Sequence, residues 1–308
     1  MTQASWPLRS LLFLPATRID WVRKIARSSV DAIILDLEDS VIPERKHEAR
    51  SLIGEAVEVL DSHGVAVVVR INALGHGGEE DLPAVVLPGV LGIMLPKADS
   101  ATDVHRLDRL IAEAESKNGV PAGKVGIVAL PETAAGLWAV REIAGASPRV
   151  TGLITAVSGP IAGDVSRAAG FSPTVEGSEQ LFLQSRTILA SRAAGANYPI
   201  GTIQGTRLDD LDTVELLARR AKQLGFSGVA LIHPSHVPIA NAIFRPTEAE
   251  VEHAKGLVEA LMTAAKAGNG ATRHEGVMVD IAMLAPAREL LARAERFRLR
   301  DEERSVGR

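Results

Sequence analysis

The sequence contains no cysteine and very few aromatic residues. Without cysteine, the chain cannot form disulfides, iron–sulfur clusters, Cys-ligated zinc sites or a thiol nucleophile. Aromatic residues make up 3% of the 308 residues, whereas hydrophobic residues make up 46%. Alanine, valine, leucine and isoleucine must therefore fill a large core, as they commonly do in parallel barrels.

The sequence also lacks a strong charge of either sign and a long apolar segment. Its formal net charge of −4 gives no sign of attraction to nucleic acids or membranes. The early apolar run Leu11–Pro15 is too short for a signal peptide or a membrane span, and it suits a strand. We therefore expect a soluble cytoplasmic protein without nucleic-acid or membrane partners.

An alternation of strand and helix patterns repeats eight times along the chain. Eight such units over about 230 residues are what a (β/α)8 TIM barrel requires. A doubly wound sheet is the alternative, because strand order cannot be deduced from one sequence. The third connection, Ala73 to Val90, is Gly-rich and only weakly helical. The strand candidates are Leu11–Pro15, Ala32–Asp39, Val65–Asn72, Gly92–Lys97, Gly126–Glu132, Gly152–Val157, Tyr198–Ile203 and Gly228–Pro234.

Two further helical patterns, Glu248–Ala267 and Ala282–Phe297, follow the eighth strand and are joined by the loop Gly268–Gly276. We predict a barrel over residues 1–245 and a C-terminal helical extension over residues 246–308. This extension must pack on its own barrel or on a neighbouring subunit. The tail from Arg298 is charged, and we expect it to be frayed.

Glu132 is the first candidate site residue. It follows the unbroken apolar run Ile127–Leu130, which suits a strand covered on both faces. A carboxylate at the end of such a strand stands at the carboxyl edge of the sheet, where α/β folds keep their ligands. We expect Glu132 to hold a metal or to act in acid/base chemistry.

The ends of the other strands carry polar residues that meet at the same mouth of a barrel. Arg70 ends an apolar strand and is costly to place there without an anionic partner, so it suggests either an anion or oxyanion role or a salt bridge. Lys97 and Asn72 suit substrate contacts or ordinary strand-end hydrogen bonds. Three acids follow the second strand and either orient metal-bound waters or form ion pairs with Arg70: Asp36, Glu38 and Asp39. Strand alternation places Asp36 and Glu38 on one face and Asp39 on the other.

Asp164 lies in the loop after the sixth strand, in the segment Ser158–Asp164. Two carboxylates and several waters are the usual way in which a protein holds Mg²⁺. Asp164 and Glu132 are therefore candidate metal ligands, although Asp164 also suits a helix cap. His233 and His236 lack the helical spacing of a zinc pair, and Gly75–Gly78 is not a dinucleotide loop.

These motifs together resemble the citrate lyase β-subunit-like (CitE-like) acyl-CoA lyases of the HpcH/HpaI aldolase superfamily. The resemblance covers nearly the whole chain in family order. The matching segments are Arg9–Pro15, Ile34–Val41 with Lys46 and Ala49–Arg50, Val69–Asn72, Leu95–Lys97, Glu132–Gly136, Gly225–Phe226, Ile232–Ser235, Phe244–Pro246 and Gly276–Asp280.

The resemblance implies a TIM barrel, usually a trimer or hexamer, that cleaves or forms a carbon–carbon bond next to a CoA thioester with Mg²⁺. Its substrates would be an acyl-CoA and a 2-oxo acid, as for citramalyl-, malyl- or citryl-CoA. By family position, Glu132 would bind the metal and Arg70 the substrate. Asp280 would reach into a neighbouring subunit's mouth as a catalytic acid/base, although it also suits the N-cap of a helix.

The chain departs from the family pattern in two places. The segment Ser158–Val165 matches the family's second metal acid at Asp164 only with a few inserted residues; without them, Gly159 falls on the ligand position. Pro199–Gly201 stands where the family usually has an Ile-Asp pair. Two alternative functions therefore remain: a class II aldolase on a small hydroxy-oxo acid without CoA, and a complex subunit without independent turnover.

Overall fold

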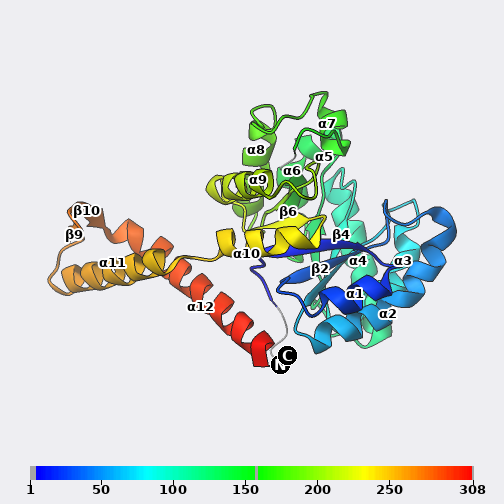
Figure 1. Cartoon of the computed structure of the whole chain (residues 1–308), viewed down its shortest axis with the longest axis horizontal. Helices are drawn as coiled ribbons and strands as arrows, with labels where there is room; N and C mark the ends of the chain where they lie inside the picture. The colour runs from blue at the N-terminus through cyan, green and yellow to red at the C-terminus, as the bar shows by residue number, and fades with distance from the viewer. Residues whose placement is uncertain (1–4, 157–158, 307–308) are drawn as a thin grey trace. The chain divides into compact units, whose positions relative to one another are not determined.

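The computed structural model describes residues 5–156 and 159–306. Its first part is a closed barrel in which each strand pairs in parallel with the next and β8 returns to β1 (Figure 1). This confirms the predicted TIM barrel and excludes an open doubly wound sheet. The strands are β1 Ser10–Pro15, β2 Ala32–Asp36, β3 Ala66–Arg70, β4 Val90–Leu95, β5 Gly126–Ala129, β6 Val150–Ala156, β7 Ile200–Thr202 and β8 Gly228–Leu231.

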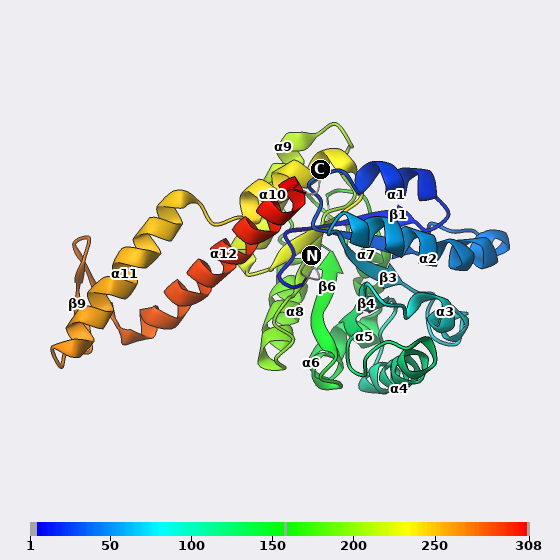
Figure 2. The same cartoon turned by 90° about the horizontal axis from the view of Figure 1, so that it is seen from below.

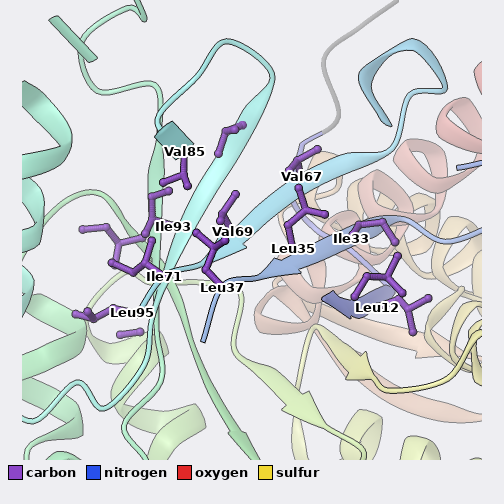
Figure 3. Close-up of a cluster of buried hydrophobic side chains, with 14 of the residues drawn as sticks. Leu12, Ile33, Leu35, Leu37, Val67, Val69, Ile71, Val85, Ile93 and Leu95 are labelled. Atoms are coloured by element: carbon purple, nitrogen blue, oxygen red, sulfur yellow. The ribbon is translucent and has the colours of Figure 1, made fainter. Parts of the chain in front are cut away.

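Alternating residues of each strand fill two separate cores. Ile33, Leu35, Val67 and Val69 point outward and pack under the helices (Figure 3). The intervening positions face the barrel interior, where the inner cluster includes Ala32, Ile34, Ala66, Val68 and Met94. Because side chains alternate with period 2, Asp36 and Arg70 continue the inner face of β2 and β3. The strand pattern thus aims both residues into the carboxyl end of the barrel.

Helices cover the outer side of the strands, as Figure 2 shows for α3 to α6. Caps set several helix starts; Ser100 and Asp103, for example, form a reciprocal capping box at α4. The weakly helical third connection contains α3, and the helical segment after β5 is divided into α5 and α6. The helices of this part are α1 Ile19–Ile25, α2 Lys46–Ser62, α3 Gly78–Val85, α4 Ala101–Asn118, α5 Ala134–Trp138, α6 Val140–Gly145, α7 Asp164–Ala169, α8 Leu181–Ala193, α9 Leu211–Leu224 and α10 Val237–Phe244.

The amino end of the barrel is closed by a buried ion pair. Arg9 donates from Nε to Asp31 Oδ2 at 2.9 Å and from Nη2 to Asp31 Oδ1 at 2.7 Å. Both side chains are almost completely buried. Nearby, Trp6 stacks on Tyr198 with 5.6 Å between ring centroids. This end is sealed by packing and by a charge-balanced pair.

Residues 245–308 form a second compact unit, and residues 1–244 form the first. The second unit contains α11 Glu248–Lys266, the antiparallel strands β9 Ala271–His274 and β10 Val277–Asp280, and α12 Leu284–Val306. Helices α11 and α12 pack side by side (Figures 1 and 2). The predicted two helices are present, but the connection that was expected to be a loop is a β-hairpin.

The charged tail is also more ordered than expected. Helix α12 continues to Val306, because Arg298 donates to Glu295 at 2.7 and 2.8 Å and to Glu302 at 2.6 Å along one helix face. Among the described residues, no helix combines the length and apolar character that crossing a membrane requires.

Candidate active site

A cavity of about 470 Å³ opens at the carboxyl ends of the barrel strands, as expected for a TIM barrel. Asp36, Asp39, Arg70, Glu132 and Asp164 line it together with the apolar side chains of Phe13 and Leu130. The sequence therefore predicted correctly that these charged residues meet at one mouth. Val157 and Ser158, at the end of the predicted sixth strand and the start of its loop, lie outside the described residues.

Arg70 is held by a two-pronged ion pair with Asp36. Its Nε and Nη2 donate to Asp36 Oδ1 and Oδ2 at 2.6 and 2.7 Å. Asp36 also accepts from the backbone N–H groups of Glu38 and Ser40, at 2.9 and 3.1 Å. Burial alone would raise the pKa of Asp36, but these hydrogen bonds and the guanidinium charge hold it below its usual value. Asp36 is thus a charged residue that positions Arg70.

The remaining edge of the guanidinium faces two further acids. Arg70 Nη1 lies 3.0 Å from Glu38 Oε2 and 3.6 Å from Asp39 Oδ2. The predicted opposite facing of Asp39 is therefore wrong: strand β2 ends at Asp36, and the chain turns so that all three acids approach Arg70. Strand periodicity does not apply beyond the last paired residue.

Lys97 links this cluster to Glu132. Its ammonium forms an ion pair with Glu38, and its backbone N–H donates to Glu132 Oε1 at 3.1 Å. Lys97 has a φ of 48°, in the left-handed region that non-glycine residues rarely occupy. Such strain costs on the order of 1–3 kcal/mol and is commonly found at functional sites.

Glu132 lies three residues beyond the end of β5 and is 8% exposed. Burial, and next the negative charge of Glu38, raise the pKa of Glu132 to about 7. In this network the described residues provide four carboxylates, Asp36, Glu38, Asp39 and Glu132. They face three cationic groups, Arg70, Lys97 and Lys46. The Lys46 ammonium donates to the carbonyl oxygens of Leu37 and Glu38 at 2.5 and 2.6 Å. Because the pKa of Glu132 is about 7, this carboxyl is only partly ionised at neutral pH, and the network gains negative charge as Glu132 loses its proton.

Asp164 reaches the cavity from the other side of the mouth. It is the first residue of α7, its side chain is 35% exposed, and Arg167 Nη2 donates to its Oδ1 at 3.0 Å. Gly163 occupies the N-cap position, so the alternative of Asp164 as the helix cap is wrong. A carboxylate that lines the cavity with a single exposed ion pair is accessible to a ligand.

Gly159 cannot substitute for Asp164 as the metal acid. A Cβ atom added at Gly159 would lie 2.6 Å from the carbonyl oxygen of Gly205, and Gly159 N–H already donates to Gln204 O at 2.8 Å. An acidic side chain does not fit there without moving the loop after β7. The role of Asp164 as the second metal carboxylate stays a prediction.

The donor set suits a hard divalent cation. Glu132 and Asp164 line one cavity, and the negative charge of the neighbouring Glu38 acts on Glu132. Oxygen ligands of this kind are those that Mg²⁺ prefers. The observations together fit a magnesium site at the carboxyl mouth of the barrel.

The family described as HpcH/HpaI aldolase/citrate lyase matches residues 9–234 of the chain. The chain belongs to this family. It is accordingly an enzyme of the carbon–carbon lyase type, as the sequence resemblance predicted.

Similar proteins cover most of the length of this HpcH/HpaI family member. The chain is 36% identical over 289 residues to a citrate lyase subunit beta-like protein of Deinococcus radiodurans, with 92% of this chain and 96% of the relative covered. It is 33% identical over 305 residues to an L-malyl-CoA/beta-methylmalyl-CoA lyase of Cereibacter sphaeroides, covering 94% and 95%. A crystal structure of CitE from Mycobacterium tuberculosis with magnesium, acetoacetate and coenzyme A matches with a TM-score of 0.67 and 30% identity, covering 93% of this chain and 97% of that chain.

Among the predicted residues of the barrel, Glu38, Lys97 and Asn72 are not part of the cavity lining, and Asp280 belongs to the second unit. The Asn72 amide and backbone N–H both donate to the buried Asp81, each at 2.8 Å, so the strand-end hydrogen bond is present. Asp280, in the second unit, accepts from Ala282 N–H at 3.0 Å and caps the short helix that begins at Ile281. The substrate role of Asn72 and the catalytic role of Asp280 stay predictions.

Sequence reasoning missed Thr202 and Gln204, which line the cavity at the end of β7. Thr202 is the last residue of β7 and Gln204 lies two residues beyond it, so their position at a strand end was the available signal. His233 and His236 do not form a metal pair: His233 Nδ1 is bonded to Ser235 Oγ at 2.7 Å, and His236 Nε2 to Leu208 O at 3.2 Å.

Proposed function

We propose that the chain is a Mg²⁺-dependent lyase that cleaves or forms a 3-hydroxyacyl-CoA thioester, such as citramalyl-, malyl- or citryl-CoA. The products of cleavage are an acyl-CoA and a 2-oxo acid. The observation that carries the proposal is the meeting of Arg70, Glu132 and Asp164 on one cavity. The relatives that act on malyl-CoA thioesters, and the solved relative that holds magnesium and coenzyme A, support the substrate class.

Glu132 and Asp164 would hold the metal, which would supply Lewis-acid chemistry that makes the substrate hydroxyl more acidic. In cleavage, the carboxylate of Asp280 of a neighbouring subunit accepts the hydroxyl proton, the bond between C2 and C3 breaks as the carbonyl of the oxo acid forms, and the electron pair passes to the thioester as an enolate. Arg70 stabilises the developing charge on the thioester oxygen, and Asp36 holds the guanidinium in place. The backbone N–H of Lys97 fixes Glu132.

A proton must then be returned to C2 of the acyl-CoA. We assign this step to Asp280 of a neighbouring subunit in a trimer or hexamer, because this carboxylate is exposed at the end of a hairpin in the second unit. A positioned acid/base contributes about 10²–10⁴ in rate. The extension over residues 246–308 would then serve as a lid on the next barrel.

The test is a panel of hydroxyacyl-CoA thioesters and free hydroxy acids, assayed with Mg²⁺ and monitored by release of the oxo acid. We expect cleavage of at least one thioester by the wild type and none by Glu132→Ala. Turnover of the free acid alone would favour the class II aldolase without CoA.

A complex subunit is the second candidate function. Two observations favour a complex subunit. The segment around Gly159 departs from the family pattern, and the Deinococcus relative is described as a subunit beta-like protein. If the wild type cleaves no panel member faster than Glu132→Ala does, the subunit function replaces the lyase proposal.

A further inference from the structure

A second cluster of ligand-type side chains lies in the C-terminal unit. His253 comes from α11, His274 is the last residue of β9, and Glu275 follows it in the hairpin turn. One ligand atom from each residue lies within 4.8 Å of the other two. The cluster thus joins α11 and the hairpin. His253 and His274 are close in space, although the rest of α11 lies between them in the sequence.

An ordinary hydrogen bond explains two of these residues but not the third. His253 Nδ1 is bonded to Glu275 Oε2 at 2.7 Å, which satisfies that pair. His274 Nε2 lies 3.8 Å from Glu275 Oε1, is inaccessible to solvent and has no hydrogen-bond partner. A buried polar atom without a partner is uncommon in a native protein and requires an explanation.

The backbone around His274 is built to hold its ring in this place. Gly256 lies in the middle of α11, where glycine is unfavourable, and a Cβ atom added there would lie 2.9 Å from His274 Cε1. Glu275 adopts a φ of 47° and Gly276 a φ of 83°, as in a tight hairpin turn. Asparagine or aspartate is the usual first residue of such a turn, whereas here a longer carboxylate reaches toward both imidazoles.

We propose that His253, His274 and Glu275 bind one divalent transition metal of the zinc class, at a site separate from the magnesium site of the barrel. Two imidazoles and one carboxylate suit zinc, and three protein ligands leave one position for water. The side chains of His253 and Glu275 are 54% and 62% exposed, so both can rotate toward a metal bound at His274 Nε2. Magnesium prefers an all-oxygen set and does not compete here.

A metal at this site cross-links the hairpin turn to α11. The hairpin is two strands of four residues each, which alone is a marginal structure. Metal binding therefore stabilises the folded C-terminal unit by an amount that depends on the free metal concentration.

The experiment titrates zinc into the untagged full chain, stripped of metal and then saturated with Mg²⁺, and follows binding by calorimetry. We expect one equivalent of zinc, and at least a tenfold loss of affinity in His253→Ala and in His274→Ala. His47→Ala, which removes an exposed histidine of α2, is the control and keeps wild-type affinity. Cobalt in place of zinc should give visible d–d absorption in the wild type that His274→Ala lacks.

Two glycine variants test whether the His274 ring binds a metal or only packs against α11. Gly256→Ala should raise the melting temperature of the metal-free chain, through helix propensity, while lowering zinc affinity by displacing the His274 ring. Gly54→Ala, in α2 with nothing within 4 Å of the added Cβ, should raise the melting temperature without affecting zinc. Absence of stoichiometric zinc binding, or wild-type affinity in His274→Ala or Gly256→Ala, would overturn the proposal, as would an equal loss in His47→Ala.

Discussion

Each end of strand β2 carries a two-pronged arginine–aspartate ion pair, but the charged groups around the two pairs differ. At the amino end, Asp31 forms a two-pronged pair with Arg9; at the carboxyl end, Asp36 forms one with Arg70. The first pair is one acid and one base sealed in packing. The second pair is surrounded by Glu38, Asp39 and Glu132 and borders a cavity.

The difference shows how one barrel separates stability from chemistry. The Arg9–Asp31 pair is almost completely buried and closes its end of the barrel. At the other end, burial and then the negative charge of Glu38 raise the pKa of Glu132, and a bound cation would favour its charged form. The structural pair and the functional pair are distinguished by their surroundings and not by their own geometry.

The strongest test of this contrast is Glu132→Gln. We expect lyase activity to fall by about 10³–10⁴-fold, because the variant removes one metal ligand and its charge. Stability should not fall, because burial and the charge of Glu38 disfavour the ionised form of Glu132, and glutamine is neutral. Steady-state kinetics and urea unfolding measure the two effects, and a large loss of stability would contradict the assignment of Glu132 to function.

Arg9→Met should show the opposite result. Removing Arg9 leaves Asp31 buried without its main partner and should reduce the free energy of unfolding by about 3–5 kcal/mol. At a temperature where the variant is fully folded, its kcat should stay within about twofold of that of the wild type. A kcat that falls as steeply as in Glu132→Gln would show that the amino end also contributes to chemistry.

The stability of the metal-free protein should depend on pH through Glu132. Its folded-state pKa of about 7 lies above the unfolded value of 4.5, so protonation favours the folded state. The stabilisation is fully present below pH 4.5 and is lost as pH rises through 7, by about 3 kcal/mol in total. Denaturant unfolding in EDTA of the wild type and Glu132→Gln isolates this dependence; parallel pH curves would contradict it.

Arg70→Lys should reduce kcat/KM by about 10²-fold. Lysine keeps the positive charge but cannot make the two-pronged pair with Asp36, so the charge that faces the thioester oxygen is misplaced. Arg149→Lys is a matched control, because Arg149 forms a similar buried pair with Glu115 away from the cavity. Equal losses of activity in both variants would mean that Arg70 acts through stability.

Asp164→Asn should have the smallest effect. We expect a loss of about tenfold in Mg²⁺ affinity and no change in unfolding, because this side chain is partly exposed and its ion pair with Arg167 is weak. Asp209→Asn removes a comparable exposed pair, with Arg207, and is the control. Unchanged Mg²⁺ affinity would remove Asp164 from the metal site and leave Glu132 without a second acidic ligand.

The sequence predicted the rim of the barrel because strand periodicity and parallel topology impose it. Arg70 ends one apolar strand and Glu132 follows another. Parallel strands of a barrel bring their carboxyl ends together. Family motifs, in addition, indicated the lyase class.

Other features depend on tertiary contacts that one strand or helix does not encode. Asp39 turns toward Arg70 because the carboxylate of Asp36 binds the next backbone N–H groups. The hairpin of the second unit is short, exposed and lacks a clear alternating pattern, so it was expected to be a loop. The cluster around His274 is assembled from two elements whose pairing no sequence period indicates.

The close approach of Gly159 to Gly205 ties together the two loops that border the cavity on its β6 and β7 side. Neither loop can be exchanged alone, because a new side chain at position 159 collides with the backbone at position 205. Directed evolution toward a different oxo acid should therefore recover paired changes in both loops. Libraries that randomise residues 159–164 and 202–206 together will sample viable sequences that single-loop libraries exclude.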